Sequence, residues 1–252
     1  MRVRTEIERF CAEIGSDPLL VQGAGGNISW KEGHILWVKA SGTRLGDAES
    51  KDIFVAVDLA GMQRAISRHN FHHAPALLQD SSLKPSIETV LHALMPQTVV
   101  LHLHAVEALA HLVRKDWKSR LRQRLRHKIP YIAVPYATPG GQLAQEVHRL
   151  IAGRDKPGAL MLQNHGVVIA GDSLHEVETT LKELIGALQC VPAVHPSIVD
   201  PDPGIAEPLK PIMTTRLHVL GQVPALLKVV REAWALYPDH VVFLGGYPTE
   251  IT

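Results

Sequence analysis

The spacing of hydrophobic residues alternates between a helical and a strand period along most of the chain. Apolar positions recur at helical spacing in residues 3–14, and two strand-like segments follow, 28–31 and 34–40, joined by a Glu-Gly turn. The further predicted strands are 53–58, 98–104, 131–136 and 160–170 (a strand or a hairpin), and the further predicted helices are 61–70, 85–95, 105–128 (broken near 116–119), 141–152 and 174–188. This mixture favours an α/β fold with helices packed on a mixed sheet.

The composition changes after residue 190. Prolines become frequent in 191–196 and again between Pro201 and Pro211, which predicts a linker or a surface crossing. A helix over 223–234 and a strand over 240–244 are predicted beyond it. We therefore expect a main domain over residues 1–190, and an arm over 191–252 that packs on the same domain.

The chemistry of the chain is most apparent at a His-x-His pair. His102 and His104 close the apolar run 98–101, which reads as a buried strand. Because side chains two apart on a strand point the same way, two imidazoles leave the same face and can reach one metal ion. In a chain with 15 histidines such a pair also arises by chance.

A third histidine strengthens the metal interpretation. His165 follows a second apolar run, 159–162, in the segment Asn164-His165-Gly166. Three histidines with a fourth position left for water or substrate are typical of catalytic zinc sites, whereas structural zinc sites are closed by four protein ligands.

Composition and charge restrict the class of protein. The chain has 252 residues, of which 46% are hydrophobic and 20% charged, so it can bury a core. Its net charge of +1 gives no general attraction to nucleic acid or membranes. Cys11 and Cys190 match no zinc or redox spacing and are expected to be thiols in a reducing compartment. The charged N-terminus is unlike a signal peptide, and no apolar run approaches the roughly 18 residues of a membrane span, so a cytoplasmic location is expected.

Two glycine- and serine-rich turns are candidates for anion binding. The first, Gly23-Ala-Gly-Gly-Asn-Ile-Ser, lacks the third glycine of a dinucleotide fingerprint and no helix follows it. Its backbone N–H groups, with the Asn27 and Ser29 side chains, are instead suited to an anion nest, although a plain turn before a hairpin explains the glycines equally. The second turn is Ala40-Ser41-Gly42-Thr43. Both could hold one phosphate if they meet in space.

Glu88 is the main candidate for an acid or base. Pro85 suits the first turn of a helix, which would place Glu88 in that turn, where the helix dipole stabilises a carboxylate with or without chemistry. His92 lies four residues on and shares the helix face. It is expected to be a structural residue or a partner of a ligand, with direct metal ligation as the alternative.

Six motifs in order resemble the class II aldolase/adducin family, typified by L-fuculose- and L-rhamnulose-phosphate aldolases. They are Gly-Gly-Asn-Ile-Ser (25–29), Ala-Ser-Gly-Thr (40–43), Pro-Ser-Ile-Glu (85–88), the His-x-His strand, Pro-Tyr-Ala-Thr-Pro-Gly (135–140) and Gln-Asn-His-Gly (163–166). The resemblance spans about residues 5–190. It implies a three-layer αβα fold around a central mixed, largely antiparallel sheet, in a homo-oligomer that is commonly a tetramer.

The resemblance also implies roles for individual residues. Zn²⁺, or another divalent metal, would be bound by His102, His104 and His165. Glu88 would complete the resting site and act as acid and base once substrate displaces it. The phosphate of a small-molecule substrate would be held by Asn27, Ser41, Gly42 and Ser86. The implied reaction is a lyase reaction, cleavage of a C–C bond in a sugar phosphate or related hydroxy-carbonyl compound through a metal-stabilised enediolate.

Two departures from the family pattern leave the reaction open. Ile87 stands where a second phosphate-binding serine is common, and residues 105–128 hold no tyrosine to protonate the leaving group. Tyr136 and His240 are alternative acids. The eight Lys and Arg residues of 114–128 form either a solvated helix face or an anion-attracting rim. An epimerase, a dehydratase, a decarboxylase or a non-catalytic adducin-like binding module are the alternative functions.

Overall fold

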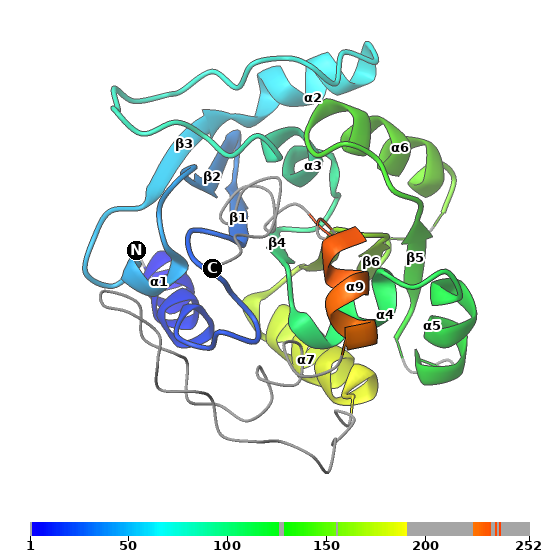
Figure 1. Ribbon diagram of the computed structural model, residues 1–252. Helices are drawn as coiled ribbons and strands as arrows, with labels where there is room; N and C mark the ends of the chain where they lie inside the picture. The colour runs from blue at the N-terminus through cyan, green and yellow to red at the C-terminus, as the bar shows by residue number, and fades with distance from the viewer. Residues whose placement is uncertain are drawn as a thin grey trace. The chain divides into compact units, whose positions relative to one another are not determined.

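The computed structural model describes residues 2–125, 129–154, 156–190, 224–232, 235 and 237. The chain divides into two units, Met1–Gln189 and Cys190–Thr252. The first unit is built on one seven-stranded sheet (Figure 1). Its strands are β1 (Asn27–Glu32), β2 (Ile35–Lys39), β3 (Phe54–Asp58), β4 (Val99–Leu103), β5 (Tyr131–Val134), β6 (Ala159–Leu162) and β7 (Gly166–Gly171).

The strand order is β3-β2-β1-β4-β7-β6-β5. Every neighbouring pair is antiparallel except β5 and β6, which run parallel. The predicted hairpin is confirmed as β1 and β2, joined at Gly33, whose φ of +59° suits a residue without a Cβ. The sheet is therefore mixed and largely antiparallel, as expected.

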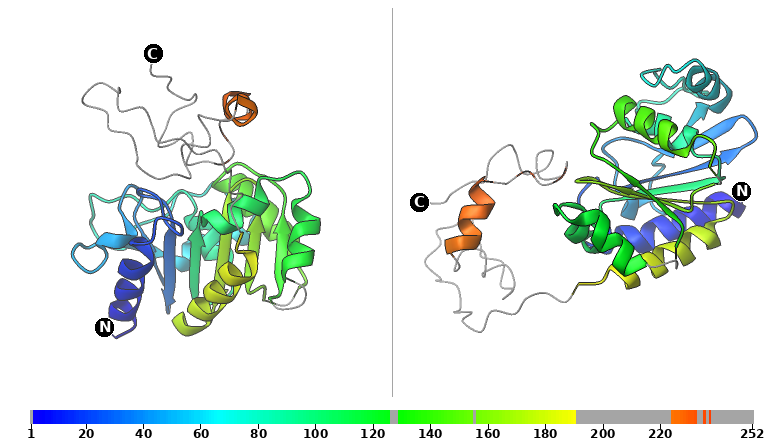
Figure 2. Two further views of the ribbon diagram at one scale, coloured as in Figure 1. Left: turned by 60° about the horizontal axis from the view of Figure 1, so that its bottom comes forward. Right: turned by 90° about the vertical axis from the view of Figure 1, so that its right-hand side faces the viewer.

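Helices cover both faces of this sheet, as the right-hand view of Figure 2 shows. One face packs against α1 (Arg2–Gly15), α4 (Val106–Leu112), α5 (Trp117–Leu125) and α7 (Leu174–Leu188). The other face packs against α2 (Leu59–Ser67), α3 (Thr89–Leu94) and α6 (Gly141–Ile151). The strands divide their side chains between the two: on β4, Leu101 and Leu103 enter the first core and Val100 enters the second. The three-layer αβα architecture is confirmed.

The helix predicted over 85–95 is shorter than expected. It begins at Thr89, with Glu88 at the N-cap, so the prediction that Pro85 and Glu88 lie in its first turn is wrong. Pro85 instead forms an isolated β-bridge with Ala40, which holds the segment in an extended conformation. A turn then leads into the helix, because the Thr89 hydroxyl donates a 2.6 Å hydrogen bond to the Ser86 carbonyl.

The other predicted elements agree with the structure to within a few residues. The break in the helical segment 105–128 is confirmed between α4 and α5, and the segment 160–170 is a hairpin of β6 and β7. In the second unit, the helix expected at 223–234 is α9 (Pro224–Glu232). The proline-rich stretch 191–211 and the strand expected at 240–244 lie outside the described residues.

Candidate metal centre

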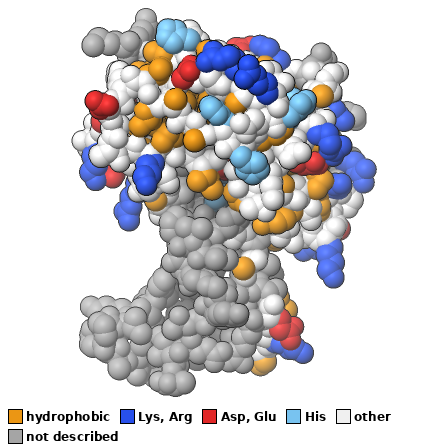
Figure 3. Space-filling view, turned by 90° about the horizontal axis from the view of Figure 1, so that it is seen from above, with side chains coloured by type: hydrophobic (Ala, Val, Ile, Leu, Met, Phe, Trp, Pro, Cys, Tyr) orange, Lys and Arg blue, Asp and Glu red, His pale blue; other side chains and the backbone are white. Residues whose placement is uncertain are grey.

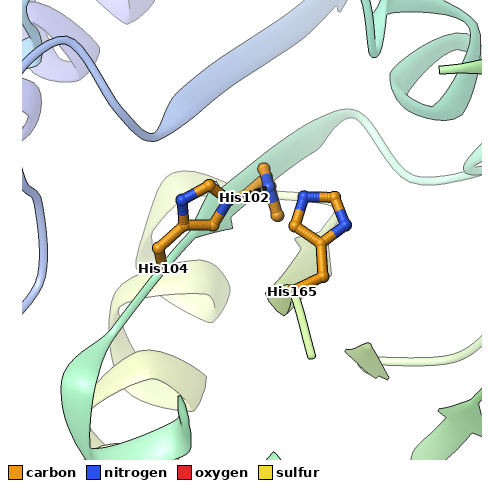
Figure 4. A group of neighbouring side chains, drawn as sticks. All are labelled: His102, His104 and His165. Carbon is orange, nitrogen blue, oxygen red and sulfur yellow. Dashed lines mark hydrogen bonds between the residues drawn. The ribbon is translucent and has the colours of Figure 1, made fainter. Parts of the chain in front are cut away.

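Three histidine side chains converge at one end of β4 (Figure 4). His102 lies within β4, His104 follows the strand, and His165 ends the turn between β6 and β7. Their exposed fractions are 1%, 8% and 2%. The Nε2 atoms of His102 and His104 are 3.1 Å apart, and one nitrogen from each of the three rings lies within 4.8 Å of the others. This spacing allows three nitrogens to bind one ion.

Glu88 places a carboxylate beside the three rings. Its Oε2 is 3.2 Å from His102 Nε2 and its Oε1 is 3.4 Å from His165 Nε2. The side chain is buried, although it belongs to a segment about fifteen residues before the His-x-His pair. The turn after Pro85, and not the first turn of a helix, delivers it to this position.

The protonation of the histidines suits metal binding. The Nδ1 of His102 lies 3.0 Å from the Val167 carbonyl oxygen, which only accepts, so this contact places the proton on Nδ1 and leaves Nε2 as a lone-pair donor. Burial lowers the pKa of His165 well below its ordinary value, and the neighbouring His102 and His104 lower it further. A neutral imidazole is the form that ligates a metal.

The donor set fits a divalent cation. Glu88 Oε1 is buried and accepts no hydrogen bond among the described residues, and such an atom costs about 1–3 kcal/mol. A cation between the carboxylate and the three imidazoles would compensate for this cost, and imidazole nitrogen suits several transition metals. The His102/His104/His165 cluster is therefore consistent with a divalent metal site.

The residues predicted to hold phosphate lie in neighbouring segments. The Asn27 amide donates to Glu88 Oε2 at 3.2 Å and to Ser86 Oγ at 3.4 Å. The Ser41 N–H donates to the Lys84 carbonyl at 2.8 Å, so the turn that contains Ser41 and Gly42 lies against the segment before Ser86. The structure thus brings the two polar turns together, while the phosphate-binding roles of these residues stay predictions.

Lys39 is a residue that the sequence analysis missed. It ends β2 and is only 2% exposed. Its ammonium group donates to the carbonyls of Ala24 and Ala40, both at 3.2 Å, and so joins the two turns. Burial lowers its pKa to about 8. The sequence signal that could have identified it is its place at the end of an apolar strand, directly before the turn Ala-Ser-Gly.

Other predicted candidates are placed elsewhere. Ser29 does not line the glycine-rich turn: it is fully buried and its hydroxyl lies 2.8 Å from His92 Nδ1. Tyr136 is 57% exposed and its backbone N–H donates to Gln163 Oε1. His240 lies outside the described residues. In the part of the chain that the structure describes, no helix is long and apolar enough to cross a membrane.

Curated proteins of three different activities are similar to the chain. An uncharacterized oxidoreductase, YuxG of Bacillus subtilis (strain 168), is 26% identical over 192 residues, which are 70% of this chain but 27% of that protein. A methylthioribulose-1-phosphate dehydratase of Microcystis aeruginosa is 27% identical, over 64% of this chain and 80% of that protein. An L-fuculose phosphate aldolase of Methanococcus maripaludis is 28% identical, over 74% of this chain and 96% of that protein. The chain thus spans about a quarter of the first of these relatives.

A solved structure and a family model agree with the fold. The N-terminal class II aldolase domain of a conserved protein from Thermoplasma acidophilum superposes with a TM-score of 0.62 at 26% identity, over 73% of this chain and 90% of that one. The model of the class II aldolase and adducin N-terminal domain matches residues 6–191. The chain belongs to the class II aldolase and adducin N-terminal domain family.

Proposed function

We propose that this chain is a metal-dependent lyase of the class II aldolase type that cleaves a C–C bond in a small sugar phosphate or a related hydroxy-carbonyl compound. The observation that carries the proposal is the Glu88 carboxylate 3.2 and 3.4 Å from two rings of the buried three-histidine cluster. A binding module has no need of this arrangement, because it buries four ionisable groups at a cost in stability. We propose Zn²⁺ as the resident metal.

The side chains of the site would have separate roles in the reaction. When bound, a divalent cation would supply positive charge that polarises a carbonyl group and stabilises the enediolate left by C–C cleavage. Glu88, displaced by substrate from the histidines, then moves a proton to or from the reacting carbon. Before substrate binds, its Oε2 accepts a 3.2 Å hydrogen bond from the Asn27 amide, which fixes the direction of the carboxylate. This amide also contacts Ser86 and so couples the acid–base group to the predicted phosphate site.

The phosphate of the substrate would lie between the two turns. Ser41, Gly42 and Ser86 offer hydroxyl and backbone donors there, and the Lys39 ammonium supplies a positive charge that no carboxylate neutralises among the described residues. An exposed Ile87 follows Ser86 and offers the substrate an apolar contact in place of a donor. Positive charge and several donors at one turn are suited to a phosphate dianion.

Dehydration is the second candidate reaction. It needs the same deprotonation next to a carbonyl, followed by loss of a hydroxyl group, and so the same carboxylate and cation serve. Two observations favour it: the similarity to a methylthioribulose-1-phosphate dehydratase over 80% of that protein, and the absence of tyrosine from residues 105–128. An epimerase or a decarboxylase would use the same groups and give different products.

The test is metal analysis followed by identification of products. Purified protein is expected to hold about one divalent ion per chain, and His102→Ala is expected to lose it. Metal-loaded protein is then incubated with a panel of ketose phosphates that includes L-fuculose 1-phosphate and methylthioribulose 1-phosphate. Dihydroxyacetone phosphate with an aldehyde indicates aldol cleavage, and a dicarbonyl product indicates dehydration. Metal-loaded protein that is silent across the panel would contradict the proposal. Light scattering tests the proposed homo-tetramer in the same preparation.

A further inference from the structure

A fully buried hydrogen bond links the strand of Asn27 to the helix of Glu88. Ser29 lies on β1, two residues after Asn27 and on the same face of the sheet. His92 lies on α3, one turn after Glu88, and its backbone N–H donates to the Glu88 carbonyl at 3.1 Å. The Ser29 hydroxyl and His92 Nδ1 are 2.8 Å apart, and both residues are 0% exposed.

The buried histidine that makes this bond lowers the stability of the fold. The second ring nitrogen of His92, Nε2, is buried and has no hydrogen-bond partner among the described residues. Burial also lowers the pKa of His92 to about 3, so the ring is neutral at physiological pH and gains nothing from ion pairing. An apolar side chain of similar size would avoid the unsatisfied nitrogen. The stability of the protein therefore does not explain why a histidine occupies this position.

Helix α3 depends on its neighbours for its orientation. It has six residues, and its N-cap, Glu88, makes no side-chain capping bond. Val90, Leu91 and Ala93 pack it into the core shared with α2 and α6, but apolar contacts are not directional and tolerate small rotations. Metal sites tolerate errors of only about 0.2 Å in their ligand distances. A directional contact on this helix therefore has a purpose that the apolar packing does not fulfil.

We propose that Ser29 and His92 are positioning residues: their hydrogen bond fixes the rotation of α3 and so holds the Glu88 carboxylate against the three-histidine cluster. The inference rests on the proposed metal-dependent function. Four polar bridges join β1 to the segment of Glu88 and α3 among the described residues. Asn27–Ser86, Asn27–Glu88 and Ser29–His92 have donor–acceptor distances of 3.4, 3.2 and 2.8 Å, and the Lys31 ammonium group donates to the Met95 carbonyl at the C-cap of α3. Among the described residues, Ser29–His92 is the bridge that reaches a side chain within α3 itself, one turn after Glu88, and this position suits an anchor for a group that substrate must displace.

The test replaces the polar pair by an apolar one and measures stability and metal binding separately. The double variant Ser29→Ala/His92→Leu leaves no orphaned partner, and we expect its metal-free melting temperature to equal or exceed that of the wild type. Its affinity for Co²⁺ is expected to fall by about 10–100-fold, as is typical when the partners of metal ligands are removed. Its Co²⁺ absorption spectrum is expected to match that of Glu88→Ala, which lacks the carboxylate.

Two single variants test which ring nitrogen of His92 must bond to Ser29. The amide of asparagine lies near the position of Nδ1, so His92→Asn can keep the bond to Ser29 and is expected to retain most of the Co²⁺ affinity. The amide of glutamine lies nearer to Nε2, so His92→Gln is expected to bind Co²⁺ as weakly as the double variant. Leu91→Val, which thins an apolar contact of the same helix, is the matched control: it should lower the melting temperature and leave the Co²⁺ spectrum unchanged.

The outcomes separate this inference from the function on which it rests. A double variant with wild-type Co²⁺ affinity and spectrum would overturn the inference alone. The same holds if that variant has a lower melting temperature but unchanged Co²⁺ affinity and spectrum. A wild-type chain that binds no Co²⁺ would overturn the proposed function and the inference together. A stable double variant that binds Co²⁺ weakly, with the spectrum of Glu88→Ala, would support both.

Discussion

The two faces of the central sheet carry different kinds of buried side chain. The face toward α1, α4, α5 and α7 is packed mainly with aliphatic and aromatic groups, and the buried His111 of α4 lies there with its Nε2 2.9 Å from the Leu188 carbonyl oxygen. The face toward α2, α3 and α6 has a similar apolar core, but near β1 and β4 it is interrupted by buried polar residues. These are Asn27, Ser29, Glu88, Thr89, His92 and His102. Because buried polar groups cost free energy, we expect the polar cluster near β1 and β4 to have a function and the opposite face mainly to stabilise the fold.

The sharpest test of this division uses neighbouring residues of β4. Leu101 faces the apolar side and His102 the metal side. We expect Leu101→Ala to lower the free energy of unfolding by about 2–5 kcal/mol, because it leaves a cavity, and to leave the metal affinity of the folded protein unchanged. His102→Ala should lower metal affinity by more than about 100-fold with a smaller loss of stability. Urea denaturation and metal titration measure the two effects. Similar losses of stability and affinity in both variants would refute the division.

The next largest effect concerns Lys39 and pH. Burial lowers its pKa from 10.5 to about 8, so between these values the folded protein binds fewer protons than the unfolded chain. Stability is therefore expected to rise with pH across this window, by on the order of 3 kcal/mol for this group. Lys39→Met should therefore lack this increase of stability with pH, and its free energy of unfolding at neutral pH should exceed that of the wild type. Denaturation curves from pH 7 to 10 measure the difference.

Lys31 provides the matched control. Burial also lowers its pKa to about 8, and its ammonium group donates to the carbonyls of Met95 and Gln97, which belong to neither of the two turns. Lys31→Met should therefore alter the pH dependence in the same direction. Only Lys39→Met should weaken binding of inorganic phosphate. Equal phosphate affinity in the two variants would refute a role for Lys39 at the turns.

A smaller effect is expected at Gly166, where the turn that carries His165 meets β4. A Cβ at this position would collide with the Leu103 carbonyl oxygen and lie 2.9 Å from His104 Cδ2. Gly166→Ala is expected to cost about 1–3 kcal/mol of stability and to weaken metal binding, because it displaces His104. Gly186, in α7 on the opposite face, has no atom within 4 Å of such a Cβ. Gly186→Ala should stabilise the helix by about 1 kcal/mol and leave metal binding unchanged.

The smallest effect is expected on α5. Arg122 and Arg124 are exposed and lie in the described part of the basic segment 114–128. If they form a solvated helix face, Arg122→Gln and Arg124→Gln should each change the free energy of unfolding by less than about 0.5 kcal/mol and leave phosphate affinity unchanged. A weaker phosphate affinity that recovers at low salt would instead indicate the anion-attracting rim.

Figure 3 shows a third kind of surface, the outer side of the layer formed by α2 and α6, where histidine and basic side chains reach the exterior. His69 and His148 pack edge to face there, with ring centroids 5.4 Å apart. Among the described residues, the only group of three histidines with converging nitrogens is the cluster at β4. Histidine content alone was thus a poor guide to the three-histidine cluster, whereas the strand context of the His-x-His pair was a good one.

Local sequence predicted the elements well because their periodicities are strong. The helix expected at 174–188 has these bounds in the structure, with Ser173 capping it through a 3.2 Å bond from the Glu176 N–H. The start of α3 was predicted wrongly because proline is compatible with both a helical first turn and an extended segment. Contact with Ala40, forty-five residues earlier in the chain, selects the extended conformation.

The sequence by itself determined the α/β class, the order of strands and helices, and the histidine pair on one face of a strand, since each depends on residues close together in the chain. Only the tertiary structure decided that the two polar turns meet over Lys39, that Glu88 lies 3.2 Å from His102, and that Ser29 pairs with His92 instead of facing the turn. The contacts Glu88–His102, Lys39–Ala24 and Ser29–His92 join residues that are 14, 15 and 63 positions apart along the chain. Their formation depends on how the sheet and its helices pack, which no local pattern of residues specifies.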